Sequence, residues 1–307
     1  MVHNTGLFRG VGAVSVINHF YGRDHIPIGA YRGPLGRPTE TPGPAWTNRG
    51  AGWYVDKLAD AFPSPVKDAS QVGDATAVFR RALAAAPLGR SVTVVSVGHA
   101  TNLLALLRSA PDEASPLTGL ELVKQKVRKL VWMGGSYWVS DRVEWNWGAC
   151  GGAANPNAST ECGSYAALPQ LTSAALKAWP AAVPTVFVSF DIGFWVRSGG
   201  VLRDGHPERS PCRQAYLHFC GGTGGGGGLP TWCDARGRNA WDLMAVVLAV
   251  RGAGRFYKLL PGFNAVDTST GLNLWRDEPW RPPYVTDHVP RWQQAPSGHY
   301  EACEAPP

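Results

Sequence analysis

The sequence predicts an α/β fold with an open, mostly parallel sheet flanked by helices. Three apolar segments, at 91–98, 127–133 and 184–190, each end in glycine or in a polar turn, the first is a continuous β-branched run, and helix-like segments lie between them. Continuous rather than alternating apolar runs are typical of parallel strands covered on both faces. In open α/β sheets the ligand site lies beyond the carboxyl ends of the strands, so functional residues are expected directly after these runs.

The first part of the chain is predicted to be helical on both sides of a long loop. Residues 11–22 have apolar side chains at helical intervals and end at a glycine, a usual C-terminal cap. The segment 24–46 is dense in proline and glycine and is expected to be an ordered loop. Residues 54–62 and 74–86 follow as amphipathic helices, and Asp74 is placed to cap the second of them.

Strands and helices then alternate. The run 91–98 leads through a short turn into a predicted helix at 102–110. The runs 127–133 and 184–190 form the second and third strands of the predicted sheet. A strongly apolar helix is expected at 238–252. This alternation predicts one large α/β domain over residues 1–307, interrupted by the insertion described below.

Composition excludes several classes of protein. The chain has 307 residues, 44% of them hydrophobic, which is enough for a substantial core. Its net charge of +6 is spread along the chain rather than gathered on one element, so no nucleic-acid partner is expected. No apolar run has the length of a membrane span, and the first twenty residues lack the pattern of a secretory signal. A cytoplasmic protein without a membrane partner is therefore expected.

Two motif-like features do not predict function. The glycine-rich stretch 221–228 contains the spacing GxGxxG, but it follows no apolar strand, and it is interpreted as a flexible loop insertion. His218, Cys220 and Cys233 match no standard zinc spacing, so free thiols are favoured over a zinc site. The same expectation of free thiols extends to the whole set, because the cysteines lack the dense spacing of a disulfide framework: Cys150, Cys162, Cys212, Cys220, Cys233 and Cys303.

The stretch "KLVWMGGSYWVSDRVEWNW", residues 129–147, contains the candidate binding residues. The apolar run breaks into two glycines, and Glu144 and Asn146 then follow two positions apart, each beside tryptophan. At alternate positions of an extended segment, the two side chains would face the same way. A carboxylate accepts hydrogen bonds from hydroxyls, and an amide both donates and accepts them, so this pair suits a sugar.

Four segments carry a resemblance to a known family. "VTVVSVGHATNLLALLRS", "KLVWMGG", "EWNW" and "AWDLMAVVLAVRG", in this order and at these separations, resemble the inosine-uridine preferring nucleoside hydrolase family. "FYGRDHIPIGAYRGPLG" and "VPTVFVSFDIG" extend the resemblance over about Val11 to Trp275. The chain is most similar to the branch in which a glycine pair is followed by "EWN".

The resemblance implies cleavage of the N-glycosidic bond of a ribonucleoside by water, releasing base and ribose. It implies that Glu144 and Asn146 bind the sugar and that a calcium ion holds the sugar diol and the attacking water. Of the calcium ligands, the family's late aspartate matches Asp242, which the resemblance also makes catalytic, and a backbone carbonyl matches Met133. Trp241 stands where some members have a base-protonating histidine, so it is expected to bind substrate by stacking.

The sequence departs from the family in its metal cluster. Calcium prefers six to eight oxygen ligands, and the family supplies several from a DxDxxxDD segment on its first strand. This sequence contains neither DxD nor two adjacent aspartates. The first strand, the metal cluster and the water-activating aspartate are therefore expected to be absent, either because the chain is truncated or because the protein has lost them. A further asparagine that many members carry upstream of the glutamate is missing too, which leaves the base preference open.

Three hypotheses follow. The protein is a nucleoside hydrolase by descent, or a non-catalytic riboside-binding member of the same fold, or another α/β protein that shares only the sheet. Each site residue also has a structural interpretation: Glu144 as a surface charge, Asp242 as a partner of the helix dipole, Asn146 as a turn cap and Trp241 as core. The small-molecule partner expected from the resemblance is a nucleoside. Loss of the first strand would leave a sheet edge open, so association of copies into a homo-oligomer is expected.

Overall fold

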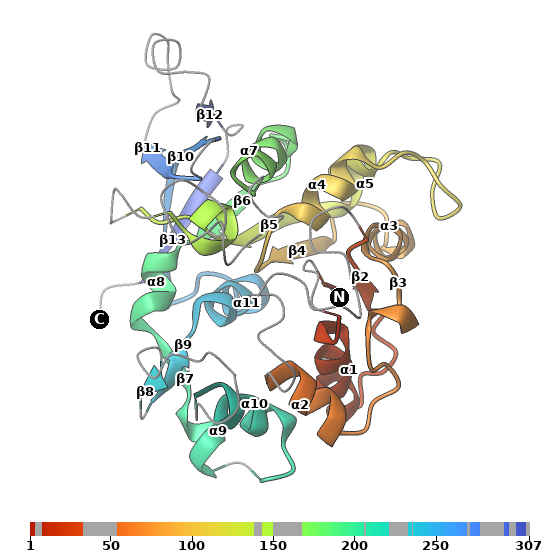
Figure 1. The fold of residues 1–307 in the computed structure, drawn as a ribbon. Helices are drawn as coiled ribbons and strands as arrows, with labels where there is room; N and C mark the ends of the chain where they lie inside the picture. Colours follow the sequence, from red (N-terminus) through yellow and green to blue (C-terminus); the bar gives the residue numbers. More distant parts are fainter. Residues whose placement is uncertain are drawn as a thin grey trace. The chain divides into compact units, whose positions relative to one another are not determined.

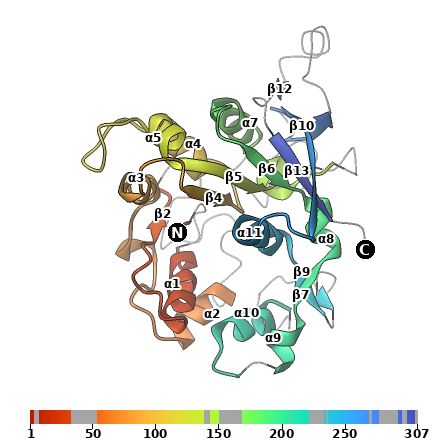
Figure 2. The ribbon, with the colours of Figure 1, turned by 180° about the vertical axis from the view of Figure 1, so that it is seen from behind.

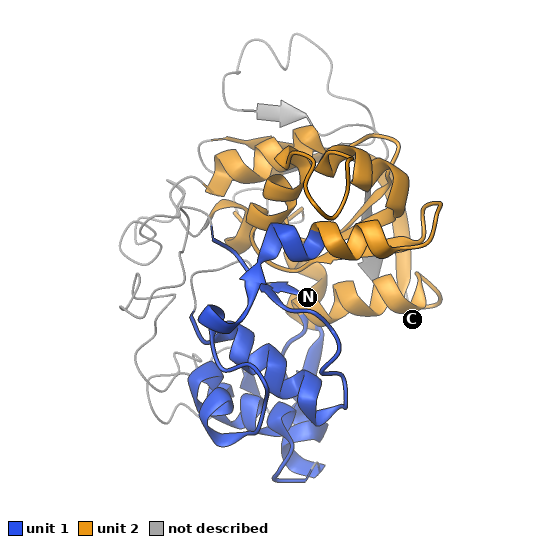
Figure 3. Cartoon of the chain, turned by 90° about the vertical axis from the view of Figure 1, so that its right-hand side faces the viewer, with its two compact units in different colours: residues 1–79, 196–240 blue, residues 80–195, 241–307 orange. Residues whose placement is uncertain are grey.

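The chain divides into two compact units. The computed structural model describes residues 1–3, 8–32, 54–137, 143–149, 168–205, 207–220, 233–234, 236–268, 271–276, 292–294 and 299–304. Met1–Phe79 and Val196–Ala240 form unit 1, and Arg80–Trp195 and Trp241–Pro307 form unit 2 (Figure 3). The expectation of a single domain over 1–307 stays a prediction beside this division. The glycine-rich stretch 221–228 and residues 33–46 of the expected loop lie outside the described residues.

Unit 2 contains the predicted sheet. Its strands lie in the order β11-β10-β13-β6-β5-β4, and β12 pairs with β10 (Figures 1 and 2). The pairs β4–β5, β5–β6 and β6–β13 are parallel, whereas β10 is antiparallel to β11, β12 and β13. The bounds are β4 (Val92–Ser96), β5 (Val127–Met133), β6 (Thr185–Val188), β10 (Tyr257–Asp267), β11 (Asn273–Arg276), β12 (Trp292–Gln294) and β13 (His299–Glu304). The open, mostly parallel sheet is confirmed.

Helices cover both faces of this sheet. Helix α11 packs against β4, β5 and β6 on one face, and α4, α5 and α7 lie together on the other (Figures 1 and 2). The bounds of the helical elements are α4 (Thr101–Arg108), α5 (Gly119–Lys126), α7 (Leu168–Ala178), α8 (Phe190–Trp195), α11 (Trp241–Arg251) and the short π-helical turn η2 (Trp145–Ala149). Coverage of both faces is the reason why the central strands are continuously apolar.

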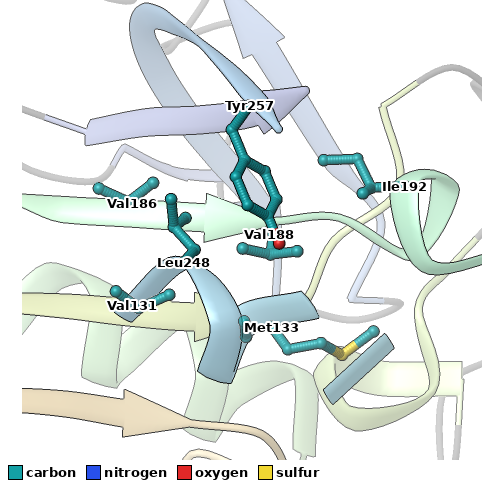
Figure 4. Close-up of a cluster of buried hydrophobic side chains, with 8 residues drawn as sticks. Val131, Met133, Val186, Val188, Ile192, Leu248 and Tyr257 are labelled. Atoms are coloured by element: carbon teal, nitrogen blue, oxygen red, sulfur yellow. The ribbon is translucent and has the colours of Figure 1, made fainter. Parts of the chain in front are cut away.

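The buried face of α11 completes an apolar cluster on the sheet (Figure 4). Ala245 and Leu248 of α11 pack there, and the Tyr257 hydroxyl donates a hydrogen bond of 2.8 Å to the Met244 carbonyl, so this polar tip is satisfied. The cluster consists of Val131, Met133, Val186, Val188, Ile192, Ala245, Leu248 and Tyr257. It fixes α11 over the carboxyl ends of β5 and β6.

Unit 1 consists of helices and two small sheets. Its helical elements are α1 (Gly10–Phe20), α2 (Tyr54–Ala61), η1 (Ala69–Gln71), α9 (Gly200–Gly205) and α10 (Pro211–Cys220). One small sheet is parallel, with β1 (Val2–His3), β2 (Gly29–Ala30) and β3 (Gly73–Asp74), and the other is antiparallel, with β7 (Arg197–Gly199), β9 (Gly237–Asn239) and β8 (Cys233–Asp234). Helix α3 (Ala75–Ala85) belongs to unit 1 at its start and to unit 2 at its end.

Two of the predicted helix ends agree with the structure. The Asp74 carboxylate accepts a hydrogen bond of 3.0 Å from the Ala77 N–H, as a capping side chain does. Gly22 follows α1 with a φ of +65°, the left-handed conformation expected after a helix. None of the helices in the described part of the chain combines the length and the hydropathy of a membrane span.

The prediction of free thiols is wrong for two cysteines. Cys220, at the end of α10, and Cys233, in β8, form a disulfide. Both sulfurs are used in that bond, so neither can ligate zinc beside His218. Cys212 is a free thiol. The expected cytoplasmic location stays a prediction.

Candidate functional site

The glycine pair after β5 is required by close packing. A Cβ on Gly134 would overlap the indole of Trp147, which lies directly against the backbone there. Gly135 has a φ of +81°, a backbone conformation that residues other than glycine rarely adopt. The Gly134 N–H donates to the Val188 carbonyl at 3.1 Å, and the Gly135 carbonyl accepts from the Phe190 N–H at 2.8 Å. The pair therefore carries the chain from β5 across the end of β6.

Glu144 holds the loop that follows. Its side chain is buried, at 2% exposure. One carboxylate oxygen accepts hydrogen bonds from the backbone N–H and the side-chain amide of Asn146, at 3.0 and 3.2 Å, and the other accepts from the Trp147 N–H at 3.1 Å. These bonds draw the chain into the turn η2, so the prediction of an extended segment is wrong. The two side chains nevertheless meet, because the carboxylate reaches forward to the amide.

Burial changes the acidity of this carboxyl. Removal from water raises the pKa of Glu144 from 4.5 to about 8, against the lowering effect of the Asn146 N–H. The negative charge of Asp242 raises the pKa as well, whereas the backbone groups of Trp147 and Gly135 lower it. At neutral pH the Glu144 carboxyl is therefore mostly protonated.

Asn146 connects this carboxyl to the end of β5. Its amide nitrogen, besides donating to Glu144, lies 3.9 Å from the Met133 sulfur, and its backbone carbonyl is 3.4 Å from the Nδ1 of His99. His99, in the turn between β4 and α4, is buried. Met133 is the last residue of β5 and belongs to the apolar cluster under α11. A ligand role for its backbone carbonyl stays a prediction.

Trp241 and Asp242 begin α11, three residues after the start of the predicted helix 238–252, because Gly237–Asn239 pair as β9 instead. The Trp241 indole N–H donates to the Phe190 carbonyl at 2.9 Å, and the two rings stack at 5.2 Å between centroids. Gly193 is required beneath it, because a Cβ there would overlap Trp241. Asp242, in the first turn of α11, is exposed and interacts electrostatically with Glu144. The start of α11 thus brings an ionisable, solvent-facing carboxylate to the loop that Glu144 holds.

A second buried carboxylate was not predicted. Asp191, in α8, accepts hydrogen bonds from the Ser136 hydroxyl at 3.2 Å and from the Tyr137 N–H at 2.7 Å. The Ser136 N–H donates to the Asn273 side-chain oxygen at 2.9 Å, and Asn264 donates to the Tyr137 hydroxyl at 2.9 Å. The segment after the glycine pair is therefore fixed from α8, β10 and β11. One signal was available for Asp191, since it follows the third predicted strand; Asn264 and Asn273 lie in strands that the sequence did not predict.

The described residues do not fit a calcium site. Among them, no group of three or more histidine, cysteine, aspartate or glutamate side chains is arranged to hold a metal ion. The predicted calcium ligands are the Asp242 carboxylate and the Met133 carbonyl, and the nearby oxygens of Glu144 are engaged by N–H groups of its own loop. Calcium prefers six to eight oxygen ligands, so two donors are insufficient.

Comparisons with known proteins identify the fold. No protein-family model and no curated protein matches the sequence. Among solved structures, the chain is similar to a plant nucleoside hydrolase, PpNRh1, at 18% identity and a TM-score of 0.54, over 97% of this chain and 83% of that one. It is also similar to the purine-preferring ribonucleoside hydrolase from Gardnerella vaginalis, at 15% identity and a TM-score of 0.57, over 98% of this chain and 82% of that one. The chain has the nucleoside hydrolase fold.

Proposed function

We propose that the protein binds ribonucleosides beyond the carboxyl ends of β5 and β6 and hydrolyses their N-glycosidic bond with water. The proposal is supported by two interactions of Glu144, its hydrogen bond with Asn146 and its electrostatic interaction with Asp242, which lies about a hundred residues away in sequence. Ligands of open α/β sheets bind at this end of the strands. The solved proteins of similar fold, a plant nucleoside hydrolase and a purine-preferring ribonucleoside hydrolase, support the substrate class.

The contacts of the three side chains suggest different roles. The exposed carboxylate of Asp242 can accept a proton and stabilise positive charge on a ribosyl ring. Asn146 is half-buried, and an amide can exchange hydrogen bonds with sugar hydroxyls. Glu144, mostly protonated at neutral pH, positions Asn146 through its carboxyl oxygen. Direct contact between Glu144 and the sugar stays a prediction.

In the proposed reaction, Asp242 alone transfers the proton from water to the departing base. The bond between the base nitrogen and the anomeric carbon breaks, and the electron pair leaves with the base. Water attacks the anomeric carbon, and its proton passes to Asp242 and then to the departing base, which restores the carboxylate. Trp241 cannot protonate the base, because its indole N–H is already donated to Phe190. Stacking of the base on this ring remains the proposed role of Trp241.

The calcium ion expected from the family is not part of this reaction. Asp242 and the Met133 carbonyl are the residues that would contact it, and further oxygen ligands would be needed. A calcium-dependent form of the reaction is therefore a separate proposal, which titration with the metal tests.

A second candidate function is riboside binding without catalysis. It is suggested by the sequence, which contains neither DxD nor two adjacent aspartates. This candidate predicts that ribosides bind and that no ribose is released.

The test is an assay of ribose released from inosine and from uridine, with and without added calcium, beside titration calorimetry of both nucleosides. Asp242→Asn should abolish release and leave the chain folded. Asp56→Asn is the matched control, because Asp56 also lies in the first turn of a helix but is in unit 1. Release by wild type that Asp242→Asn does not reduce would refute the assigned role. Binding without release would select the second candidate, and neither signal would exclude both.

A further inference from the structure

His99 is a buried imidazole that the proposed reaction does not use. It lies in the turn that follows β4, whose last residue is Ser96, and its side chain is 3% exposed. A buried N–H group needs an acceptor, because without one it loses the hydrogen bonds that it makes in water. The His99 Nδ1 lies 3.4 Å from the Asn146 backbone carbonyl, so the ring donates to that oxygen when Nδ1 carries the proton. His99 thus connects the end of β4 to the loop that carries Asn146.

The Asn146 carbonyl needs a donor from outside its own turn. The last carbonyls of a helical turn have no partner within that turn. In η2 the N–H groups of Trp147 and Gly148 both donate to the Glu144 carbonyl, at 3.2 and 3.1 Å. The Asn146 carbonyl lies later in the turn, and His99 reaches it from the neighbouring strand end. All of these residues belong to unit 2.

With this bond, both peptide groups of Asn146 are held. The N–H groups of Asn146 and Trp147 donate to the Glu144 carboxyl oxygens at 3.0 and 3.1 Å. They belong to the peptide groups before and after the Asn146 Cα. His99 binds the carbonyl of the second group, which is then held at both ends. Because a peptide group is planar, holding both groups fixes φ and ψ of Asn146 and so the direction of its side chain.

We propose that His99 is a positioning residue of the nucleoside site: through its bond to the Asn146 carbonyl, it holds the Asn146 amide in the orientation that binds substrate. The proposal rests on the proposed function, because it assigns His99 to the same site. Glu144 holds the amide nitrogen at 3.2 Å, and His99 holds the backbone behind it. His99 acts through Asn146 and contacts no substrate atom, so its replacement should weaken nucleoside binding only while the Asn146 side chain is present.

The first experiment measures amide hydrogen exchange of Asn146 and Trp147 by NMR and needs no nucleoside. Asparagine places its side-chain N–H near the position of the imidazole Nδ1, whereas glutamine places it near Nε2. His99→Asn should therefore keep the protection of both amides. His99→Gln should make them exchange about tenfold faster, the upper end of what one hydrogen bond contributes. His218→Gln, in α10 of unit 1, is the matched control and should change neither amide.

The order of the two His99 variants separates a hydrogen bond from simple packing. Glutamine fills more of the space of the imidazole than asparagine does, so a packing role predicts that His99→Gln is the milder change. Equal exchange in wild type and both variants, or faster exchange in His99→Asn than in His99→Gln, would overturn the proposal.

The second experiment measures the affinity for inosine by calorimetry, with and without Asn146→Ala. His99→Gln should lower the affinity about tenfold in the wild-type background and have no further effect beside Asn146→Ala, because the effect passes through that side chain. His99→Asn should restore most of the affinity. Equal losses in the two backgrounds would show a structural effect and overturn the proposal. A wild type that binds no nucleoside would refute the proposed function and the role of His99 towards substrate, and the exchange rates would still show whether His99 holds the turn.

Discussion

Replacing Glu144 by glutamine should make the stability of the protein less dependent on pH. The buried carboxyl keeps its proton up to a pKa of about 8, whereas in the unfolded chain it releases the proton near 4.5. Between these values the unfolded state binds fewer protons than the folded state, so the free energy of unfolding falls as pH rises. The contribution of the protonated Glu144 carboxyl to the free energy of unfolding is complete below pH 4.5, and it is lost as pH rises through 8.

The size of the effect follows from the two pKa values. Their difference of about 3.5, at about 1.4 kcal/mol for each pH unit, corresponds to about 5 kcal/mol of lost stability above pH 8. Glutamine cannot ionise, so Glu144→Gln removes this loss. Its amide group would also point an N–H donor at the N–H of Asn146 or Trp147, which costs about 1–3 kcal/mol at every pH. The variant should therefore be less stable than wild type at pH 5 and more stable at pH 9.

The assay is urea unfolding at pH 5 to 9, followed by tryptophan fluorescence, since the fully buried Trp147 donates to Glu144. Glu121→Gln is the control without a pH-dependent effect in this range. The Thr118 hydroxyl lowers the pKa of Glu121, so the contribution of this carboxylate to stability is constant above pH 4.5 and its loss should shift the whole profile without changing its slope. Parallel pH profiles for wild type and Glu144→Gln would refute a buried carboxyl with a raised pKa.

Three further predictions concern packing, the unpredicted carboxylate and the disulfide. Gly134→Ala should destabilise the protein by about 1–3 kcal/mol, because its Cβ would displace the Trp147 indole; an unchanged urea midpoint would contradict this packing. Asp191→Asn should lower the affinity for nucleosides in calorimetry while secondary structure by circular dichroism is retained, because it weakens the bonds that fix the segment after the glycine pair. Unchanged affinity would remove Asp191 from the site. Thiol titration of the denatured protein should detect two fewer free thiols in the unreduced sample than in the reduced one, because of the Cys220–Cys233 disulfide. Equal counts would exclude the disulfide.

The local sequence was sufficient to predict the strands whose hydrophobic pattern matches their burial in the fold. The second predicted strand, 127–133, has the bounds of β5, because its apolar part, Leu130–Met133, is buried between helices on both faces of the sheet. In contrast, β10 was not predicted. It contains Pro261 and Gly262, which disfavour a strand, and it is held by antiparallel pairing to β11, β12 and β13. Tertiary pairing outweighs local propensity there.

The candidate site shows a similar division. Glu144, Asn146 and Asp242 could be found because each stands in a short motif after a strand or at a helix start. The hydrogen bonds from Asn146 and Trp147 to the Glu144 carboxylate could not be predicted from the sequence, because the same residue spacing fits both a turn and an extended segment. The Asp191 contacts with Ser136 and Tyr137 join positions more than fifty residues apart, and no local pattern encodes them.

The disulfide between Cys220 and Cys233 has a consequence for protein engineering. It joins the end of α10 to β8 with their Cα atoms 5.6 Å apart, so both ends of the intervening segment are fixed by a covalent bond. Each doubling of the length of such a closed loop costs only about 0.6 kcal/mol in entropy. A tag or a small reporter domain inserted into this segment would therefore enter and leave the protein at two adjacent, anchored points, and α10 and β8 would keep their attachment to each other.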